Sequence, residues 1–211
     1  MKKMHSLFAA LGLACAVSGV GGGPASAEQM KFMGLTAEQM IDAAFIEEVR
    51  GWIEVPVVQI AIVSQNARRG DLPQSEIDRL DEQWRAERGT DDQPLITSVL
   101  SNPVSSYLTR IQANSLGLYP EIFVTDSQGL NVGQSVITGD YWQGDEAKFQ
   151  KTYGAGAGAV FLDEPELNED TKSWRSQLNF TVHDADGAPI GHATVEVNLT
   201  ELARRHRFMG N

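Results

Sequence analysis

The last third of the chain alternates between apolar and polar side chains in two runs, residues 178–183 and 191–199. The apolar side chains fall on every second position, which is the period of a β-strand with one buried face. Between the runs, the segment from Asp184 to Pro189 has the aspartates, glycine and proline that are typical of a turn. Consecutive strands joined by a short turn pair antiparallel, so the C-terminal half is restricted to folds with an antiparallel sheet.

A second hairpin is predicted at residues 121–125 and 130–135, on either side of the sequence Asp126-Ser127-Gln128-Gly129. An aspartate side chain accepts hydrogen bonds from its own turn, and a glycine tolerates a positive φ. Beyond this hairpin we expect a short helix at residues 146–153 and a further strand at residues 159–163, after a linker of alternating glycine and alanine.

The first half of the mature chain is predicted to be helical. The sequence Thr36-Ala37-Glu38-Gln39 is a capping box, in which Thr36 and Gln39 satisfy each other's backbone N–H groups. Apolar residues then recur at steps of three and four, as on one face of a long helix: Ile41, Phe45, Val49, Trp52, Ile53, Val57 and Ile60. Pro56 removes a backbone donor, so this helix is expected to kink near Trp52 or to break into two helices.

Further helices are expected at residues 75–88, 95–100 and 104–113, and Thr200 is expected to cap a last helix. Helices followed by a set of strands predict an α+β fold rather than a doubly wound nucleotide fold. By length, residues 28–211 form a single domain, with a helical part at 28–118 and a sheet part at 119–211.

Residues 1–27 have the pattern of a signal peptide, with Lys2 and Lys3, an apolar run from Leu7 to Val20, and small residues before a cleavage point after Ala27. The apolar run is too short to span a bilayer. Lipoprotein processing at Cys15 is a less favoured alternative, because Gly12 stands where leucine is preferred. We therefore expect export to the periplasm.

The chain has a formal net charge of −11, which becomes −13 without Lys2 and Lys3 because no acidic residue precedes Glu28. An acidic surface disfavours nucleic acid and anionic membranes as partners. Cys15 is the only cysteine, so a chain cleaved after Ala27 has no disulfide and no thiol chemistry.

Between the two predicted hairpins lies the segment Gly139-Asp140-Tyr141-Trp142-Gln143-Gly144-Asp145-Glu146. Together with the hairpin before it, this segment resembles the extracytoplasmic, PAS-like sensor domains known as Cache or PDC domains. The resemblance implies a PAS-like antiparallel sheet with a long N-terminal helix packed on one face and short helices and loops covering the other. It also implies a free-standing periplasmic sensor that signals through a membrane sensor or transporter, with a homodimer as an open question.

For the ligand, a small polar organic molecule such as a carboxylate or an amine, the expected binding residues are Arg110, Tyr141, Trp142, Tyr107 and Thr181. An inward Arg110 would bind a carboxylate with two parallel hydrogen bonds, whereas a solvated Arg110 is the plainer interpretation. Trp142 fits a core position as well as a pocket wall. The polar strand residues, Thr181 among them, face either water or a covered pocket.

The sequence contains no motif for catalysis, cofactor binding or a metal. A nucleophile elbow, an H-E-x-x-H motif and a phosphate loop are all missing, and His183 and His192 lack a third ligand at a fixed spacing. We therefore expect a non-enzyme that uses no cofactor. The alternative is an interaction or dimerisation protein that uses the long amphipathic helix and binds no ligand.

Overall fold

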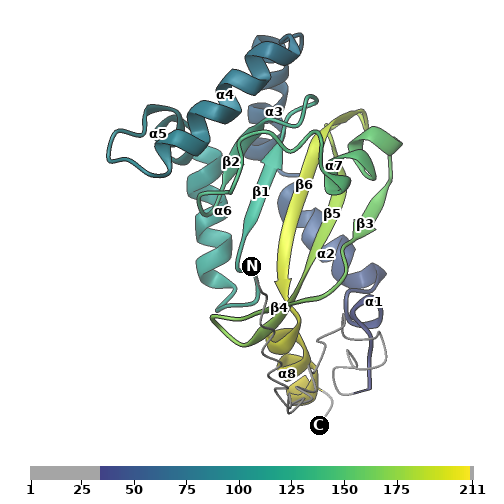
Figure 1. Cartoon of the computed structure of the whole chain (residues 1–211). Coiled ribbons are helices and arrows are strands. Elements are labelled where there is room, and N and C mark those ends of the chain that lie inside the picture. The colour runs from purple at the N-terminus through teal and green to yellow at the C-terminus, as the bar shows by residue number, and fades with distance from the viewer. Residues whose placement is uncertain (1–33, 210–211) are drawn as a thin grey trace, which may run out of the picture.

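The computed structural model describes residues 34–209. The signal peptide predicted at residues 1–27, with Cys15, lies outside the described residues. The helices are α1 (Ala37–Met40), α2 (Ala43–Ile53), α3 (Pro56–Arg69), α4 (Gln74–Glu87), α5 (Pro94–Leu100), α6 (Pro103–Asn114), α7 (Ala147–Gln150), η1 (Tyr153–Ala155, a 3₁₀ helix) and α8 (Leu199–Met209). The strands are β1 (Ile122–Thr125), β2 (Asn131–Gln134), β3 (Val160–Leu162), β4 (Glu166–Asn168), β5 (Ser173–His183) and β6 (Pro189–Asn198) (Figure 1).

The strands form one antiparallel sheet in the order β2-β1-β6-β5-β3, and β4 also pairs with β5. Both predicted hairpins are confirmed: β1 pairs with β2, and β5 pairs with β6 over nearly their whole length. Strand β1 joins the two hairpins because it also pairs with β6, with Ile122 opposite Val195. The predicted α+β class and the PAS-like antiparallel sheet are therefore confirmed.

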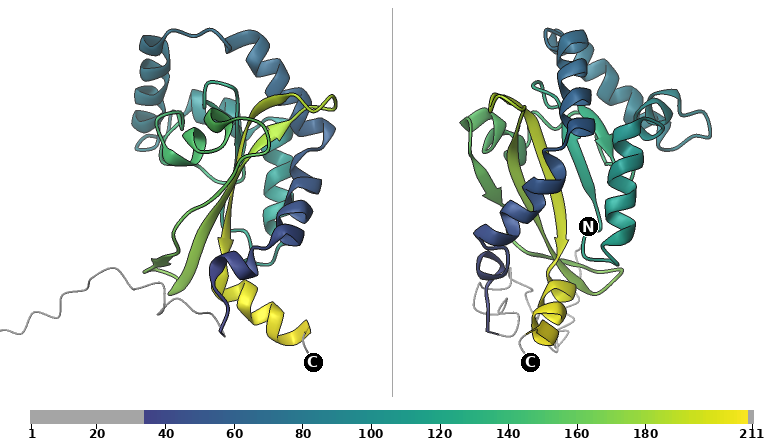
Figure 2. Two further views of the ribbon diagram at one scale, coloured as in Figure 1. Left: turned by 90° about the vertical axis from the view of Figure 1, so that its right-hand side faces the viewer. Right: turned by 180° about the vertical axis from the view of Figure 1, so that it is seen from behind.

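One face of the sheet is apolar and packs against α2, α3 and α6, which lie in front of the sheet in the right-hand view of Figure 2. The predicted alternation accounts for this face, because every second residue of β5 and β6 points into the same core. The core contains Val49, Ile53, Val58, Ile62, Val104, Leu108, Ile122, Val124, Leu178, Phe180, Val182, Ala193, Val195 and Val197.

The predicted N-terminal helix is present as three segments. The capping box at Thr36 is confirmed, but Asp42 starts a new helix by accepting a hydrogen bond from the Phe45 N–H. Pro56 is the first residue of α3, so of the two expectations for this proline the break is correct. Pro56 cannot donate to the carbonyl of Trp52, four residues earlier, and the Tyr107 hydroxyl donates to that carbonyl instead, at 2.8 Å.

Two features of the fold differ from the sequence expectations. No strand was predicted between residues 163 and 178, but Glu166–Asn168 forms β4 because β5 begins at Ser173, earlier than its alternation indicates. Thr200 accepts a hydrogen bond from the Trp174 N–H, and the side chain that accepts from the first turn of α8 is Asn198. No helix within residues 34–209 is long and apolar enough to cross a membrane.

Candidate ligand-binding hollow

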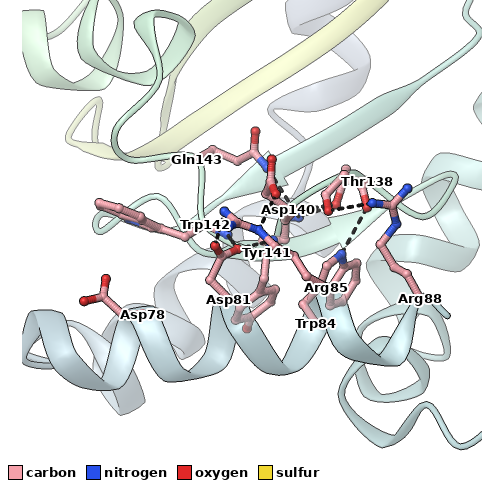
Figure 3. A network of polar contacts seen from close by, with 12 residues as sticks. Asp78, Asp81, Trp84, Arg85, Arg88, Thr138, Asp140, Tyr141, Trp142 and Gln143 are labelled. Carbon is pink, nitrogen blue, oxygen red and sulfur yellow. Dashed lines mark hydrogen bonds and ion pairs between the residues drawn. The ribbon is translucent and has the colours of Figure 1, made fainter. Parts of the chain in front are cut away.

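Tyr141 and Trp142 lie in a segment that is fixed to α4 (Figure 3). The carboxylate of Asp81 on α4 accepts from the backbone N–H groups of both residues, at 2.8 and 3.1 Å. The Tyr141 ring stacks on Trp84, with ring centroids 5.3 Å apart. Tyr141 is only 1% exposed, and its phenol oxygen accepts from Arg69 at 2.6 Å. These aromatic side chains therefore belong to a second small core beneath α4.

Further contacts hold the same segment. Arg85 bridges Asp81 and Asp140, and the Trp84 indole donates to the carbonyl of Thr138 at 3.0 Å (Figure 3). The Trp142 indole, which is partly buried, donates to the carbonyl of Gln128 at 2.8 Å. Since the backbone of residues 138–142 is bonded from several sides, the side chains of this segment have fixed directions.

The other three predicted binding residues lie elsewhere. Arg110 is exposed on α6, as in the expectation of a solvated arginine and not of an inward one. Tyr107 lies among the helices on the apolar face, where it bonds Trp52. Thr181 is fully buried on the opposite face of β5, where its hydroxyl donates to the Gly156 carbonyl at 3.1 Å. The structure therefore does not bring the five predicted residues together.

The polar face of the sheet is covered by other segments of the protein and is not exposed to solvent. Buried on it are Thr125, Asn179, Thr181, His192 and Thr194. The His192 ring lies within hydrogen-bonding distance of the Thr194 hydroxyl, at 3.0 Å, and Phe149 packs edge-on against it. Complete burial, with Lys148 nearby, lowers the pKa of His192 to about 3, so the ring is neutral. This end of the polar face is filled.

The other end of the polar face is hollow. Two cavities, of about 260 and 220 Å³, lie there, and Glu146 and Lys148 line both of them. The larger cavity also reaches Arg175 and Glu196 on the sheet, and the smaller reaches Glu121. Thr138, Gly139, Asp140 and Gln143 form a wall of the smaller cavity. The segment singled out in the sequence thus lines this hollow with its polar residues and not with Tyr141 or Trp142.

Lys148 is the central charge of this hollow. Its ammonium lies 3.0 Å from Glu146 and 5.3 Å from the centre of the Phe123 ring, and only 13% of its side chain is exposed. Across the larger cavity, Arg175 pairs with Glu196 at 3.0 Å. The hollow therefore offers cations and carboxylates within one small, partly enclosed volume.

Glu121 is poised between its two charge states. Burial, with the Glu196 carboxylate as the second cause, raises the pKa of Glu121 to about 7. Burial also raises the pKa of Glu196, against the effect of its partner Arg175. A cation bound beside Glu121 would favour its ionised form, and shifted carboxyl groups in a cavity are typical of binding sites.

Unpaired polar atoms lie behind the wall of the smaller cavity. Asn131 Oδ1 and Gln134 Nε2 are buried without a hydrogen-bond partner among the described residues. The other side-chain atoms of both residues bond Thr138, at 2.8 and 3.4 Å. Buried polar groups are nearly always paired, so these two atoms are exceptions in the described part of the chain. Within residues 34–209 no cluster of histidine, cysteine and acidic side chains is arranged to hold a metal.

Sequence reasoning missed Lys148, Glu121 and Arg175. Lys148 lies on a four-residue helix and Glu121 just before a strand, and neither belongs to a recognisable motif. Glu196 alone gave a signal, since it falls on the polar row of an alternating strand. The others meet only because β1 pairs with β6 and α7 folds back over both.

No protein-family model and no curated protein matches the chain. Among solved structures, it is similar to the ligand-binding domain of the Pseudomonas aeruginosa PAO1 amino acid chemoreceptor PctC in complex with GABA, with 16% identity and a TM-score of 0.38 over 74% of this chain and 62% of that chain. The sensor domain of the V. cholerae histidine kinase DctB matches with 13% identity and a TM-score of 0.34 over 75% of this chain and 58% of that chain.

The sensory domain of the Campylobacter jejuni chemoreceptor Tlp3 matches with 13% identity and a TM-score of 0.36, over 75% of this chain and 64% of that chain. The chain spans less than two thirds of the length of each of these three structures. At this level of likeness, neither a family nor a function passes from them to this chain.

Proposed function

We propose that the chain is a periplasmic, Cache-like sensor domain that binds a small polar molecule in the hollow around Lys148, catalyses no reaction and signals occupancy to a membrane protein. One observation carries the proposal: two cavities meet at Lys148 and Glu146 between a sheet face and its covering segments. The signal peptide predicted at residues 1–27 supports the periplasmic location.

The charges of the hollow favour a ligand that carries both an amine and a carboxylate. The smaller cavity contains one ammonium, that of Lys148, beside the carboxylates of Glu121, Asp140 and Glu146. A ligand amine would pair with Glu121, and a ligand carboxylate with Lys148. Because these groups are partly desolvated, such pairs are worth more than the same pairs at the surface.

The place of Lys148 in the chain suggests how occupancy is signalled. Lys148 lies on α7, and Glu146 directly precedes this helix. Phe149 of the same helix packs on His192 of the sheet. A ligand that draws Lys148 away from Glu146 therefore acts on the segment that covers the sheet. A partner that contacts this covering segment would read the change.

The test is a thermal-shift screen of the chain against amino acids, other zwitterions, amines and organic acids. A ligand at a hundred times its dissociation constant stabilises the fold by about 2.7 kcal/mol. Lys148→Met should abolish the shift, whereas Lys172→Met, which removes a lysine with 72% of its side chain exposed, should leave it unchanged. The proposal is wrong if no compound in the panel shifts the melting temperature, or if the Lys148→Met variant responds like the wild type.

A second measurement addresses catalysis. Any compound that shifts the melting temperature is incubated with the chain and then analysed by mass spectrometry. We expect it to be recovered unchanged, and a product formed at a rate proportional to protein concentration would contradict the non-catalytic part of the proposal.

A further inference from the structure

A second cavity system lies on the opposite side of the sheet, between α3 and α6. Its larger part, of about 410 Å³, falls in the size range of small-molecule pockets and has mainly apolar walls, from Val57, Ile60, Ala61, Pro103, Val104 and Val132. It continues into a part of about 260 Å³ that is lined by Arg68, Arg69 and Tyr141. The two parts share Gln65, Arg68, Asn102 and Val132, so they form one groove with an apolar end and a cationic end.

The charge of this groove is opposite to that of the chain. The chain carries 28 acidic residues and a net charge of −11, yet α3, α5 and α6 contain no aspartate or glutamate. Arg68 and Arg69 form the cationic end, where they also complement the negative end of the α3 dipole. In the part of the chain that the structure describes, neither arginine pairs with a carboxylate within 4.0 Å, and Arg69 donates to the Tyr141 hydroxyl.

An exposed apolar side chain, that of Ile60, borders the apolar end of the groove. Ile60 is 65% exposed and Val63 is 44% exposed, both on α3. Phe45 and Trp52, earlier in the same amphipathic pattern, pack against the core. Within this pattern, which runs from Ile41 to Ile60, Ile60 is the exposed residue, and it lines the groove.

We propose that this groove binds an aliphatic carboxylate, with its chain along Val57, Ala61 and Val104 and its carboxylate against Arg68 and Arg69. From Val57 to Arg68 the helix axis rises by roughly 16 Å, which gives room for an extended chain. A guanidinium binds a carboxylate through two parallel hydrogen bonds, and the apolar walls gain from covering the chain. The groove and the hollow lie on opposite faces of the sheet, so this inference stands apart from the proposed function.

Titration calorimetry with decanoate, below the concentration at which it forms micelles, tests the inference. Decanoate should bind with one site per chain. Decanol, which has the alkyl chain without the charge, should bind about tenfold more weakly or worse. Acetate, which has the charge without the long alkyl chain, should not bind measurably. Equal binding of decanoate and decanol would overturn the assignment of the cationic end, and no binding of decanoate would overturn the whole inference.

Two variants and one matched control locate the site. Arg68→Gln should weaken decanoate binding by about tenfold or more, and Ala61→Phe should block the groove. Arg110→Gln removes the same charge from α6 outside the groove and should bind like the wild type. An Arg68→Gln variant with wild-type affinity would refute the site.

Light scattering distinguishes the rival occupant, a second copy of the chain. We expect a monomer whose mass does not change with decanoate. The inference would be wrong if the chain formed a dimer that the Ile60→Asp substitution dissociates but decanoate does not. The groove would then be an interface between copies of the chain.

Discussion

Replacing Glu121 by glutamine should stabilise the protein at alkaline pH and leave its stability at acid pH unchanged. The pKa of Glu121 is raised from 4.5 to about 7 by burial and by Glu196. Ionisation of this carboxyl is therefore easier in the unfolded chain than in the folded one. The wild type loses stability as the pH rises from 4.5 through 7, and glutamine, which stays neutral, does not.

The raised pKa sets the magnitude. A rise from 4.5 to about 7 corresponds to about 3 kcal/mol in favour of the variant above pH 7, at 1.36 kcal/mol per unit. Because Glu121 is only partly buried and solvent screens a partly exposed charge, we expect about 1 to 3 kcal/mol. Well below pH 4.5 the difference vanishes, since both side chains are neutral.

The ionisation of His192 changes stability with pH in the opposite direction to that of Glu121. The variant must therefore be compared with the wild type at each pH. The pKa of His192 falls from 6.5 to about 3 on folding, so the wild type gains stability as the pH rises through this range. Over the pH range from 4.5 to 6.5 the two effects offset each other in the wild type. In the Glu121→Gln variant the histidine effect is no longer offset by Glu121, so the stability of the variant should rise more with pH than that of the wild type.

Urea unfolding of both proteins at pH values of about 4, 6 and 8 measures the difference. Glu164→Gln is the control, because it removes an exposed carboxylate that lines the same hollow, and it should not change the pH dependence. If Glu121→Gln and the wild type show parallel stability against pH, Glu121 ionises as it does in the unfolded chain, and the electrostatic description of the hollow is wrong.

Three further substitutions test the fold around the two sites. Gly129→Ala should cost about 2 kcal/mol or more, because φ is +85° and a Cβ would lie 2.6 Å from the backbone nitrogen of Gly144; a neutral result in urea unfolding would contradict this. Asp81→Ala should cost about 2 to 4 kcal/mol, since two buried backbone N–H groups lose their acceptor, and an unchanged near-ultraviolet circular dichroism spectrum would argue against it. Tyr107→Phe should cost about 1 to 2 kcal/mol by leaving the Trp52 carbonyl unpaired. An unchanged denaturation midpoint would contradict this prediction.

The fold was predictable where the signal is local. The alternation around residues 178–199 fixes which side chains of β5 and β6 face the core, and the capping box at Thr36 fixes the start of α1. Strand β4 was not predictable in this way, because three residues are too few to show a period and its pairing depends on where β5 begins.

The site was predictable only in part, because its geometry depends on distant residues. Adjacent residues of an extended segment face opposite ways, and the sequence does not say that Asp81 and Trp84, far earlier in the chain, turn Tyr141 toward α4. Asp140 and Gln143, from the same segment, line the cavity instead. Lys148 and Glu121 carry no motif, and only the completed sheet brings them together.

The hydrogen bond from Tyr107 to the Trp52 carbonyl has a mechanical consequence for the helical layer. A proline break usually leaves a loose joint, since one carbonyl has no partner and the two helices are free to swing. Here Tyr107 of α6 supplies the partner, so the joint between α2 and α3 is tied to a third helix. A displacement of α6 along its axis would therefore pull on this joint as well as on the sheet.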